Sequence, residues 1–221
     1  MRKNLPDGDI LVIDDASPDG TADVAEEMGL SDAHISVLRR PAKLGLGVAY
    51  IDGYRRVLAK GYETILCMDA DFSHDPMVLP KIVEALADTD LVIGSRYIPG
   101  GATPDWKFSR RLLSRMGNLT ARVLLSVPTR DNTTGYRGYR REALQKLDFD
   151  TIKLTGYGFM IETAYRSYLN GMRIKEIPIT FIDRRAGKSK MSGSIIREAL
   201  FYVVKLRLQH IKDQLFGTKK K

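Results

Sequence analysis

Two carboxylates stand two residues apart at the end of an apolar run, and this spacing first suggests chemistry. The run, residues 64–68, has the composition of a short buried strand, and Asp69 and Asp71 follow it. In an extended segment, side chains two residues apart point to the same side. Clustered carboxylates repel one another and are costly to desolvate, so a site that holds them usually also holds a cation. Oxygen ligands suit Mg²⁺ or Mn²⁺, and Mg²⁺ usually shares its shell with substrate phosphates.

The same residues have a simpler interpretation. Asp is common in turns, so Asp69 and Asp71 are also consistent with turn formers at a strand end, with Asp75-Pro76 opening the next helix. On these residues alone both interpretations stay open. The neighbouring segments favour the metal site, because further charged residues follow other predicted strands.

Apolar runs alternate with helical patterns through the first half of the chain. Strands are expected at residues 9–13, 35–38, 64–68 and 91–93, with a helix after each of the first three. This alternation predicts a largely parallel α/β sheet flanked by helices. Ligands of such sheets bind beyond the carboxyl ends of the strands. The side chains expected to converge there are Asp14, Asp15, Lys43, Asp69, Asp71 and Arg96.

Charge and cysteine content restrict the class of protein. The 221 residues carry a net charge of +8 and match one domain of ordinary composition. Residues 184–221 hold eleven Lys/Arg against two acids, which is +9, so the rest of the chain is near −1. This distribution argues against a nucleic-acid binder. The single cysteine, Cys67, lies in an apolar run, and no signal peptide is visible, so we expect a cytoplasmic protein.

The C-terminal segment is predicted to be a basic amphipathic helix. Between residues 192 and 216, apolar residues recur at helical spacing, and lysines and arginines accompany them. Such a helix can lie in the interface of an anionic membrane, or its apolar stripe can pack onto the rest of the protein. Both alternatives are open. We therefore expect a catalytic part, residues 1–191, and a helix with a tail, residues 192–221.

Five motifs occur together and in order, and they carry a resemblance that covers nearly the whole chain. They are Asp14-Asp15-x-Ser-Pro-Asp-Gly-Thr, Lys43-x-Gly-Leu-Gly, Met68-Asp-Ala-Asp-x-Ser-His, Gly94-Ser-Arg-Tyr and Arg184-x-x-x-x-Ser-Lys. The chain resembles the GT-A glycosyltransferases of family 2, and within them the dolichol-phosphate (polyprenol-phosphate) mannose synthases. The resemblance implies a Rossmann-like GT-A fold. It also implies metal-dependent transfer of mannose from GDP-mannose to dolichyl or polyprenyl phosphate, on the cytoplasmic face of a membrane.

The resemblance also assigns roles to residues. Ile13 and Asp15 would contact the nucleoside, and Asp69 and Ala70 would lie along the donor. Asp71, with Ser73 beside it, would hold Mg²⁺ or Mn²⁺. The residues that would bind phosphates of the donor or the acceptor are Arg96, Arg184 and Lys190. Arg110 and Ser114 match the acceptor-phosphate region, and Asp71 and Arg96 would be the catalytic pair.

Two residues have roles that their sequence context leaves open. Arg137 follows Thr134-Gly135 and would face the acceptor phosphate or pair with Asp131. Glu162 lies in a mostly apolar helix and would approach the sugar or pair with a neighbouring arginine.

The expected chemistry needs no general base. A lipid phosphate monoester has a second pKa of about 6, so at pH 7 it is already largely ionised. His34 and His210 lie away from the motifs, and His74 is expected to support Asp71 rather than to react. Attack on the anomeric carbon opposite the diphosphate would invert the configuration and give a β-linked product.

The chain departs from the family pattern at its start. The family begins with a strand ending in a Pro-Thr-Tyr-Asn-Glu type motif, and residues 1–8 leave no room for it, so we expect the first βα unit to be missing. Its loss would expose sheet edge, weaken donor binding and favour self-association. Alternatives to the mannosyltransferase are a UDP-glucose-dependent glucosyltransferase and an inactive subunit that binds nucleotide or a partner. A membrane-anchoring partner is a further expectation.

Overall fold

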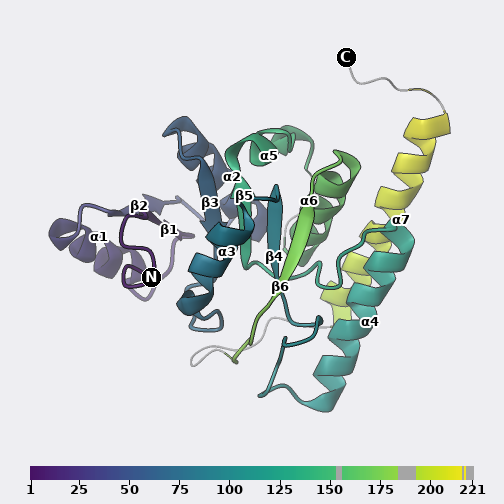
Figure 1. The fold of residues 1–221 in the computed structure, drawn as a ribbon, viewed down its shortest axis with the longest axis horizontal. Helices are drawn as coiled ribbons and strands as arrows, with labels where there is room; N and C mark the ends of the chain where they lie inside the picture. The colour runs from purple at the N-terminus through teal and green to yellow at the C-terminus, as the bar shows by residue number, and fades with distance from the viewer. Residues whose placement is uncertain (153–155, 184–192, 216, 218–221) are drawn as a thin grey trace.

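Strands and helices alternate along the chain as far as Ser95, and four helices longer than one turn frame the strands after it (Figure 1). The structure is a computed structural model that describes residues 1–152, 156–183, 193–215 and 217, with side chains throughout except at Tyr157, 193–200 and 213–215. The strands are β1 (Ile10–Asp14), β2 (Ile35–Arg39), β3 (Thr64–Cys67), β4 (Leu91–Ser95), β5 (Arg137–Arg140) and β6 (Ile174–Pro178). The α-helices are α1 (Thr21–Ser31), α2 (Leu46–Ala59), α3 (Leu79–Ala85), α4 (Phe108–Leu125), α5 (Arg141–Gln145), α6 (Tyr157–Leu169) and α7 (Gly193–Leu215). Single 3₁₀ turns lie at η1 (Pro76–Val78) and η2 (Phe149–Thr151).

The strands form two sheets. β1 and β2 pair in parallel, and the second sheet has the order β3-β5-β4-β6. β4 and β6 are parallel, whereas β5 is antiparallel to both β3 and β4. The expected largely parallel arrangement is therefore correct for two of the four pairings. β5 differs because residues 131–136 lie at the carboxyl end of β4, so the chain enters β5 from that edge and must run back.

The two sheets are separate. Among the described residues, β1 pairs with β2 alone and β3 pairs with β5 alone. Helix α2 lies against β1 and also contacts α6 of the larger half of the molecule. Its approach to β1 is close, because a Cβ at Gly53 would collide with the side chain of Ile13.

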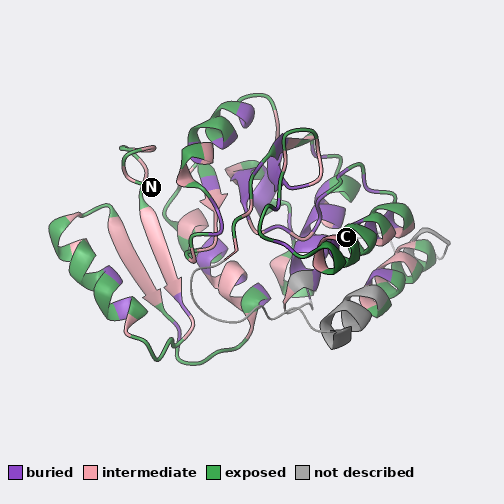
Figure 2. Ribbon diagram, turned by 90° about the horizontal axis from the view of Figure 1, so that it is seen from below, coloured by how far each residue is buried: buried purple, intermediate pink, exposed green. Residues whose placement is uncertain are grey.

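The core lies on both faces of the four-stranded sheet. One apolar cluster joins α2, α5 and α6 to β3, β4 and β5, and a second joins α3 to β4 and β6. All five residues of β4 are buried, because this strand lies between two others and beneath helices on each side. Figure 2 shows the buried residues gathered here, while β1, β2 and α1 are mostly half-buried or exposed.

Helices α4 and α7 form a layer of their own at the far side of the molecule from β1 and β2 (Figure 1). A third apolar cluster joins Ala121 and Leu125 of α4 to Tyr165 of α6 and Val203 of α7. The expected C-terminal helix is thus present over Gly193–Leu215, and part of its apolar stripe packs onto the rest of the protein.

Candidate active site

The loop after β3 holds the Asp71 carboxylate in a fixed turn. The Ser73 hydroxyl donates to Asp71 Oδ1 at 2.5 Å, and the Ser73 backbone N–H donates to the same oxygen at 3.1 Å. Phe72 adopts a left-handed φ of 64°, which makes the chain turn sharply between these two residues. Two hydrogen bonds on one oxygen fix the Asp71 carboxylate relative to the end of β3. Ser73 thus lies beside Asp71, and the binding of a metal by these two residues stays a prediction.

His74 supports this loop from beneath. Its Nδ1 accepts a hydrogen bond from the Asp69 backbone N–H at 3.0 Å, so the proton of the neutral ring is on Nε2. The ring is buried and stacks on Tyr136 with centroids 4.7 Å apart. Desolvation, helped by the Arg96 charge, lowers the pKa of His74 to about 4. His74 is therefore neutral at pH 7 and holds the backbone at Asp69, whereas the sequence suggested that it supports Asp71.

Arg96, at the carboxyl end of β4, is held by a buried carboxylate. Its Nε and Nη2 donate to the two oxygens of Asp131, each at 2.7 Å, and Nη2 also donates to the Thr133 hydroxyl at 2.7 Å. Desolvation acts to raise the pKa of Asp131, but the charge and hydrogen bonds of Arg96 outweigh it and keep that pKa below its usual value. The pair fixes the direction of the guanidinium.

Aromatic rings join Arg96 to the Asp71 loop. The Arg96 guanidinium lies 5.2 to 5.6 Å from the ring centroids of Tyr97, Trp106 and Phe181. Phe181 also meets the ring of His74 edge-on at 5.5 Å. The aromatic cluster is defined here as His74, Tyr97, Trp106, Tyr136 and Phe181. It places Arg96 within electrostatic reach of the loop, because both Arg96 and Asp71 act on the pKa of His74.

Two further predicted residues lie on the same cluster. The guanidinium of Arg110 stacks over Trp106 at 4.0 Å and binds both oxygens of Asp183, at 2.7 and 2.9 Å. Ser114, one turn further along α4, accepts a hydrogen bond from the Tyr97 hydroxyl at 2.6 Å. The structure thus brings Asp71, Arg96, Arg110 and Ser114 to one continuous region at the carboxyl ends of β3 and β4.

Arg137 has a different place from the one the sequence suggests. It is fully buried and donates to the backbone carbonyls of Asn132, Thr134 and Met160 and to the Thr163 hydroxyl. Arg96, rather than Arg137, is the partner of Asp131. Because its N–H groups donate to protein oxygens and its side chain is buried, Arg137 does not reach a ligand. This corrects the expected contact with the acceptor phosphate. Arg137 ties the loop of residues 131–135 to α6.

The residues predicted for the nucleoside lie at the end of β1. Arg40 bridges Asp15 and Asp52, with its Nε 2.9 Å from an Asp52 oxygen. Asp14 Oδ2 accepts the Ser17 backbone N–H at 3.1 Å, whereas its buried Oδ1 has no hydrogen-bond partner. Ile13 is half-buried, and its side chain lies against α2 at Gly53. A buried carboxylate oxygen without a partner is a position where a ligand donor fits.

The remaining predicted residues divide into those the structure places and those it does not describe. Ala70 and Lys43 are exposed. Glu162 is buried and binds the Arg166 guanidinium and the Tyr202 hydroxyl, so it pairs with a neighbouring arginine, one of its two expected roles. Arg184 and Lys190 lie outside the described residues.

The donor atoms near Asp71 fit a hard divalent cation. They are carboxylate and hydroxyl oxygens, which Mg²⁺ and Mn²⁺ prefer. Within the described residues no group of three or more His, Cys, Asp or Glu side chains comes together. Such a site fits a cation that takes few protein ligands and completes its shell with phosphates and water.

Sequence reasoning missed the residues that hold this region together. Asp131, Thr133 and Phe181 contact Arg96 although they lie 35 or more residues away along the chain. Trp106 packs against both Arg96 and Arg110. Gly135 was also missed: a Cβ there would lie 2.6 Å from the Tyr50 hydroxyl and 3.3 Å from Asp69 Oδ1. The polar run of residues 131–135 was the available signal, since such runs between periodic segments form loops that carry function.

Comparison with known proteins agrees with this geometry. The family model described as glycosyl transferase family 2 matches residues 2–148. An undecaprenyl-phosphate mannosyltransferase from Micrococcus luteus is 46% identical over 205 residues, which cover 93% of this chain and 84% of that protein. A polyprenol monophosphomannose synthase from Mycolicibacterium smegmatis is 45% identical over 215 residues, covering 96% of this chain and 81% of that protein.

Solved structures share the fold at lower identity. Glucosyl-3-phosphoglycerate synthase from Mycobacterium tuberculosis, in complex with Mn²⁺, UDP and glucosyl-3-phosphoglycerate, has a TM-score of 0.60 at 20% identity, covering 90% of this chain and 68% of that one. Its complex with Mg²⁺ and UDP has the same TM-score and identity, with 89% and 67% covered. These neighbours confirm the expected GT-A fold. The family match and the two close relatives confirm the resemblance seen in the motifs: this chain belongs to glycosyl transferase family 2.

Proposed function

We propose that this protein transfers mannose from GDP-mannose to a polyprenyl phosphate, giving polyprenyl-phosphate mannose and GDP. The names of the two close relatives support the sugar and the acceptor class. The observation that carries the proposal is the aromatic cluster, because it joins the Asp71 loop to Arg96, Arg110 and Ser114. A carboxylate pair for a metal and donor, next to arginines for a phosphate acceptor, is the combination that this transfer requires.

On the donor side, Asp71 with Ser73 would hold Mg²⁺ or Mn²⁺, since a structural neighbour has been crystallised with each of these ions. The ion supplies neutralisation of the diphosphate as it leaves. Ile13 and Asp15 would contact the nucleoside, and Asp69 and Ala70 would lie along the sugar diphosphate. Arg184 and Lys190 would add positive charge at the same phosphates.

On the acceptor side, Arg96, Arg110 and Ser114 would bind the phosphate of the polyprenyl chain. A phosphate oxygen forms the new bond to the anomeric carbon, while the bond from that carbon to the diphosphate breaks and GDP leaves with the electron pair. Attack from the opposite face inverts the anomeric centre. No proton has to be removed from the ionised phosphate. His74 is not suited to act as a general base, because its Nδ1 already accepts a hydrogen bond from the Asp69 N–H.

The acceptor also places the protein at a membrane. A polyprenyl tail lies within the bilayer, so we infer that the protein works as a peripheral protein at the cytoplasmic face. No helix in the described part of the chain is both long and apolar enough to cross a bilayer. The side chains of Phe201, Val204 and Leu208 on α7 are exposed, as an interfacial helix requires.

Radiolabel transfer tests the proposed reaction. With Mn²⁺, labelled GDP-mannose and a polyprenyl phosphate in detergent, we expect label in the lipid fraction and a β-linked product by NMR. Labelled UDP-glucose should transfer at least tenfold more slowly. Label in an α-linked product would contradict the inverting mechanism. Binding of GDP-mannose with no transfer at all would instead indicate a binding subunit.

A further inference from the structure

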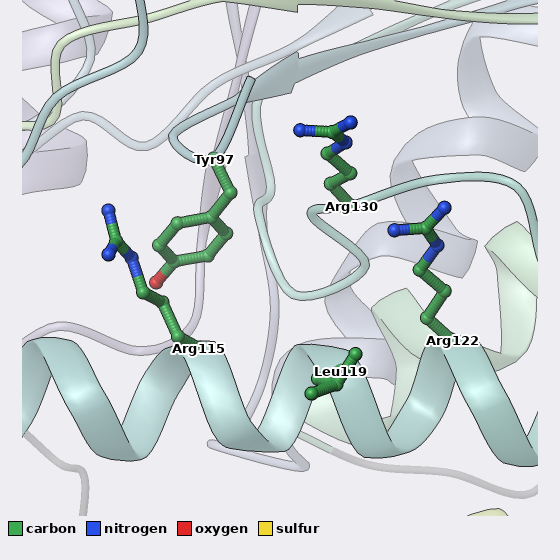
Figure 3. A pocket seen from close by; sticks show the side chains of 5 residues that line it. All are labelled: Tyr97, Arg115, Leu119, Arg122 and Arg130. Atoms are coloured by element: carbon green, nitrogen blue, oxygen red, sulfur yellow. The ribbon is translucent and has the colours of Figure 1, made fainter. Parts of the chain in front are cut away.

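A pocket lined by three arginines lies beside the acceptor region, and these arginines have no part in the reaction described above (Figure 3). Arg115, Leu119 and Arg122 face it from α4, where their spacing of four and three residues puts them on one side of the helix. Tyr97 and Arg130 complete the lining from the opposite side. The pocket has a volume of about 190 Å³ and is open to solvent.

Nothing that lines this arginine pocket compensates its charge. No acidic residue is among the lining residues, and helix α4 contains no Asp or Glu along its 18 residues. Of the ion pairs found between described residues, none involves Arg115, Arg122 or Arg130. The Glu176 carboxylate lies nearby, but it accepts hydrogen bonds from the backbone N–H groups of Arg130 and Asp131, both at 2.9 Å, and not from the Arg130 guanidinium. Three guanidinium groups around a small hollow form a site for a phosphate-bearing anion.

Apolar side chains on α4 and α7 are exposed to solvent, and one of them, Leu119, also lines the pocket. Along α4 the exposed residues follow one another at helical spacing, and Phe108 and Val123 at its two ends are 77% and 66% exposed. The exposed apolar residues of the two helices are Phe108, Leu112, Leu113, Met116, Leu119 and Val123 on α4, and Phe201, Val204, Leu208 and Ile211 on α7. The two helices pack together through other residues, among them Leu125 and Val203, and no apolar cluster among the described residues includes the exposed ones. Figure 2 shows both helices largely exposed on their outer sides.

An exposed apolar stripe next to uncompensated arginines matches the chemistry of an anionic membrane surface. The arginines attract the headgroups, and the apolar residues enter the boundary between headgroups and acyl chains. A free phosphate would satisfy the arginines but would leave the apolar residues in water. The combination therefore favours a phosphate ester carried by a lipid.

We propose that the arginine pocket binds the phosphodiester headgroup of an anionic phospholipid and that α4 and α7 dock on the bilayer around it. This inference rests on the proposed membrane function and names the surface involved. The site borders the acceptor region, because the Tyr97 ring lies 5.2 Å from the Arg96 guanidinium and 5.9 Å from that of Arg115. A headgroup bound there would bring Ser114 to the depth at which the phosphate of a membrane-bound acceptor lies.

Vesicle flotation of the full chain tests this proposal. The test variant carries Arg115→Gln, Arg122→Gln and Arg130→Gln together. The control carries Arg56→Gln, Lys81→Gln and Lys146→Gln, which remove the same charge from exposed positions on other elements. Each cation close to an anionic surface strengthens binding about fivefold, so the test variant should lose roughly 100-fold in binding to phosphatidylglycerol-containing vesicles. The control should lose less than about threefold.

Two further experiments distinguish a specific headgroup site from attraction by positive charge alone and from a site for free phosphate. A variant with lysine at the three positions keeps the charge but loses the planar guanidinium groups, and we expect it to bind roughly tenfold more weakly than the wild type. Wild-type binding by the lysine variant would overturn the pocket as a headgroup site. Inorganic phosphate alone, titrated by calorimetry, should bind at least 100-fold more weakly than the vesicles. Equal affinity would overturn the lipid as the occupant.

The experiments distinguish failure of the headgroup site from failure of the proposed mannosyltransferase function. In detergent, the glutamine variant should transfer mannose at the wild-type rate, because the pocket lies outside the reacting groups. If the wild type does not float with the vesicles, both the membrane function and the pocket assignment fall. If the wild type floats and the glutamine variant floats equally well, only the pocket assignment falls.

Discussion

The two sheets differ in how firmly they hold their functional residues. Around the four-stranded sheet, β4 is entirely buried, and Arg96 and Asp131 form an ion pair that is almost closed to water. At the two-stranded sheet, Asp14 is the one buried residue of β1, and none of β2 is buried. Arg40 is buried there as well, with 3% of its side chain exposed, but its partner Asp15 is 24% exposed. Arg96, which we propose for the acceptor, is fixed before any ligand binds, whereas Asp15, which we propose for the nucleoside, stays partly accessible.

This difference predicts two kinds of mutational effect. Substitutions near the four-stranded sheet should lower the free energy of unfolding, because buried charges lose their partners. Substitutions at the end of β1 should leave stability nearly unchanged and weaken donor binding instead. The predictions below test this contrast, from the largest expected effect to the smallest.

Asp131→Asn should have the largest effect. It leaves the buried Arg96 guanidinium without a counter-charge, and breaking a buried ion pair in this way costs about 3 to 5 kcal/mol. Urea unfolding measures this change. As a control, Asp90→Asn breaks the exposed pair with Arg173 and should cost less than about 1 kcal/mol. Equal effects in the two variants would remove the contrast between buried and exposed pairs.

His74 should make stability depend on pH. Its pKa is about 4 in the folded protein, against about 6.5 in the unfolded chain, so between these values the unfolded chain alone binds the proton. Lowering the pH from 7 to 4.5 should therefore destabilise the fold by about 2 kcal/mol. The lowered pKa of Asp131 adds a loss only below about pH 4, where that carboxylate begins to protonate in the unfolded chain. In His74→Gln the dependence between pH 7 and 4.5 should largely disappear, as followed by thermal unfolding.

Arg137→Lys separates a structural role from acceptor binding. Lysine cannot reproduce the bonds to three carbonyls, so we expect a loss of about 2 kcal/mol in stability with an unchanged KM for polyprenyl phosphate. Arg110→Gln should show the reverse: a KM raised roughly tenfold, the loss expected for one charged hydrogen bond, with little change in stability. A raised acceptor KM in Arg137→Lys would restore its predicted contact with the acceptor.

Asp15→Asn should have the smallest effect on stability. Arg40 keeps Asp52 as a partner, so the cost should be less than about 1 kcal/mol. GDP-mannose affinity should nevertheless fall roughly tenfold by calorimetry, because the proposed nucleoside contact is lost. A large loss of stability here would show that the donor side is as firmly built as the acceptor side.

The motifs predicted which residues of the loop after β3 lie together. Asp71 and Ser73, two residues apart, lie in hydrogen-bond contact, and His74 holds the same loop, although it bonds the Asp69 backbone rather than Asp71. Alternating strands and helices predicted the α/β fold, because the periodicity of apolar residues reports local structure directly. These features depend on residues that are close together in the chain, so the sequence alone can predict them.

The long-range features were not visible. Asp131 meets Arg96 across 35 residues, and Phe181 meets it across 85. No local pattern encodes such pairings, so Arg137 was an equally good candidate for Asp131 until the fold placed it against α6. The reversed direction of β5 was missed for the same reason, since strand order depends on where a long connection returns.

Binding of GDP-mannose to wild type and to Asp71→Asn, with and without Mn²⁺, tests the central claim most directly. By isothermal titration calorimetry, Mn²⁺ should tighten wild-type binding at least 30-fold, because the ion joins the Asp71 carboxylate to the diphosphate. In Asp71→Asn the metal effect should vanish while the unfolding free energy stays within about 1 kcal/mol of the wild type. An equal metal effect in both proteins would contradict the account.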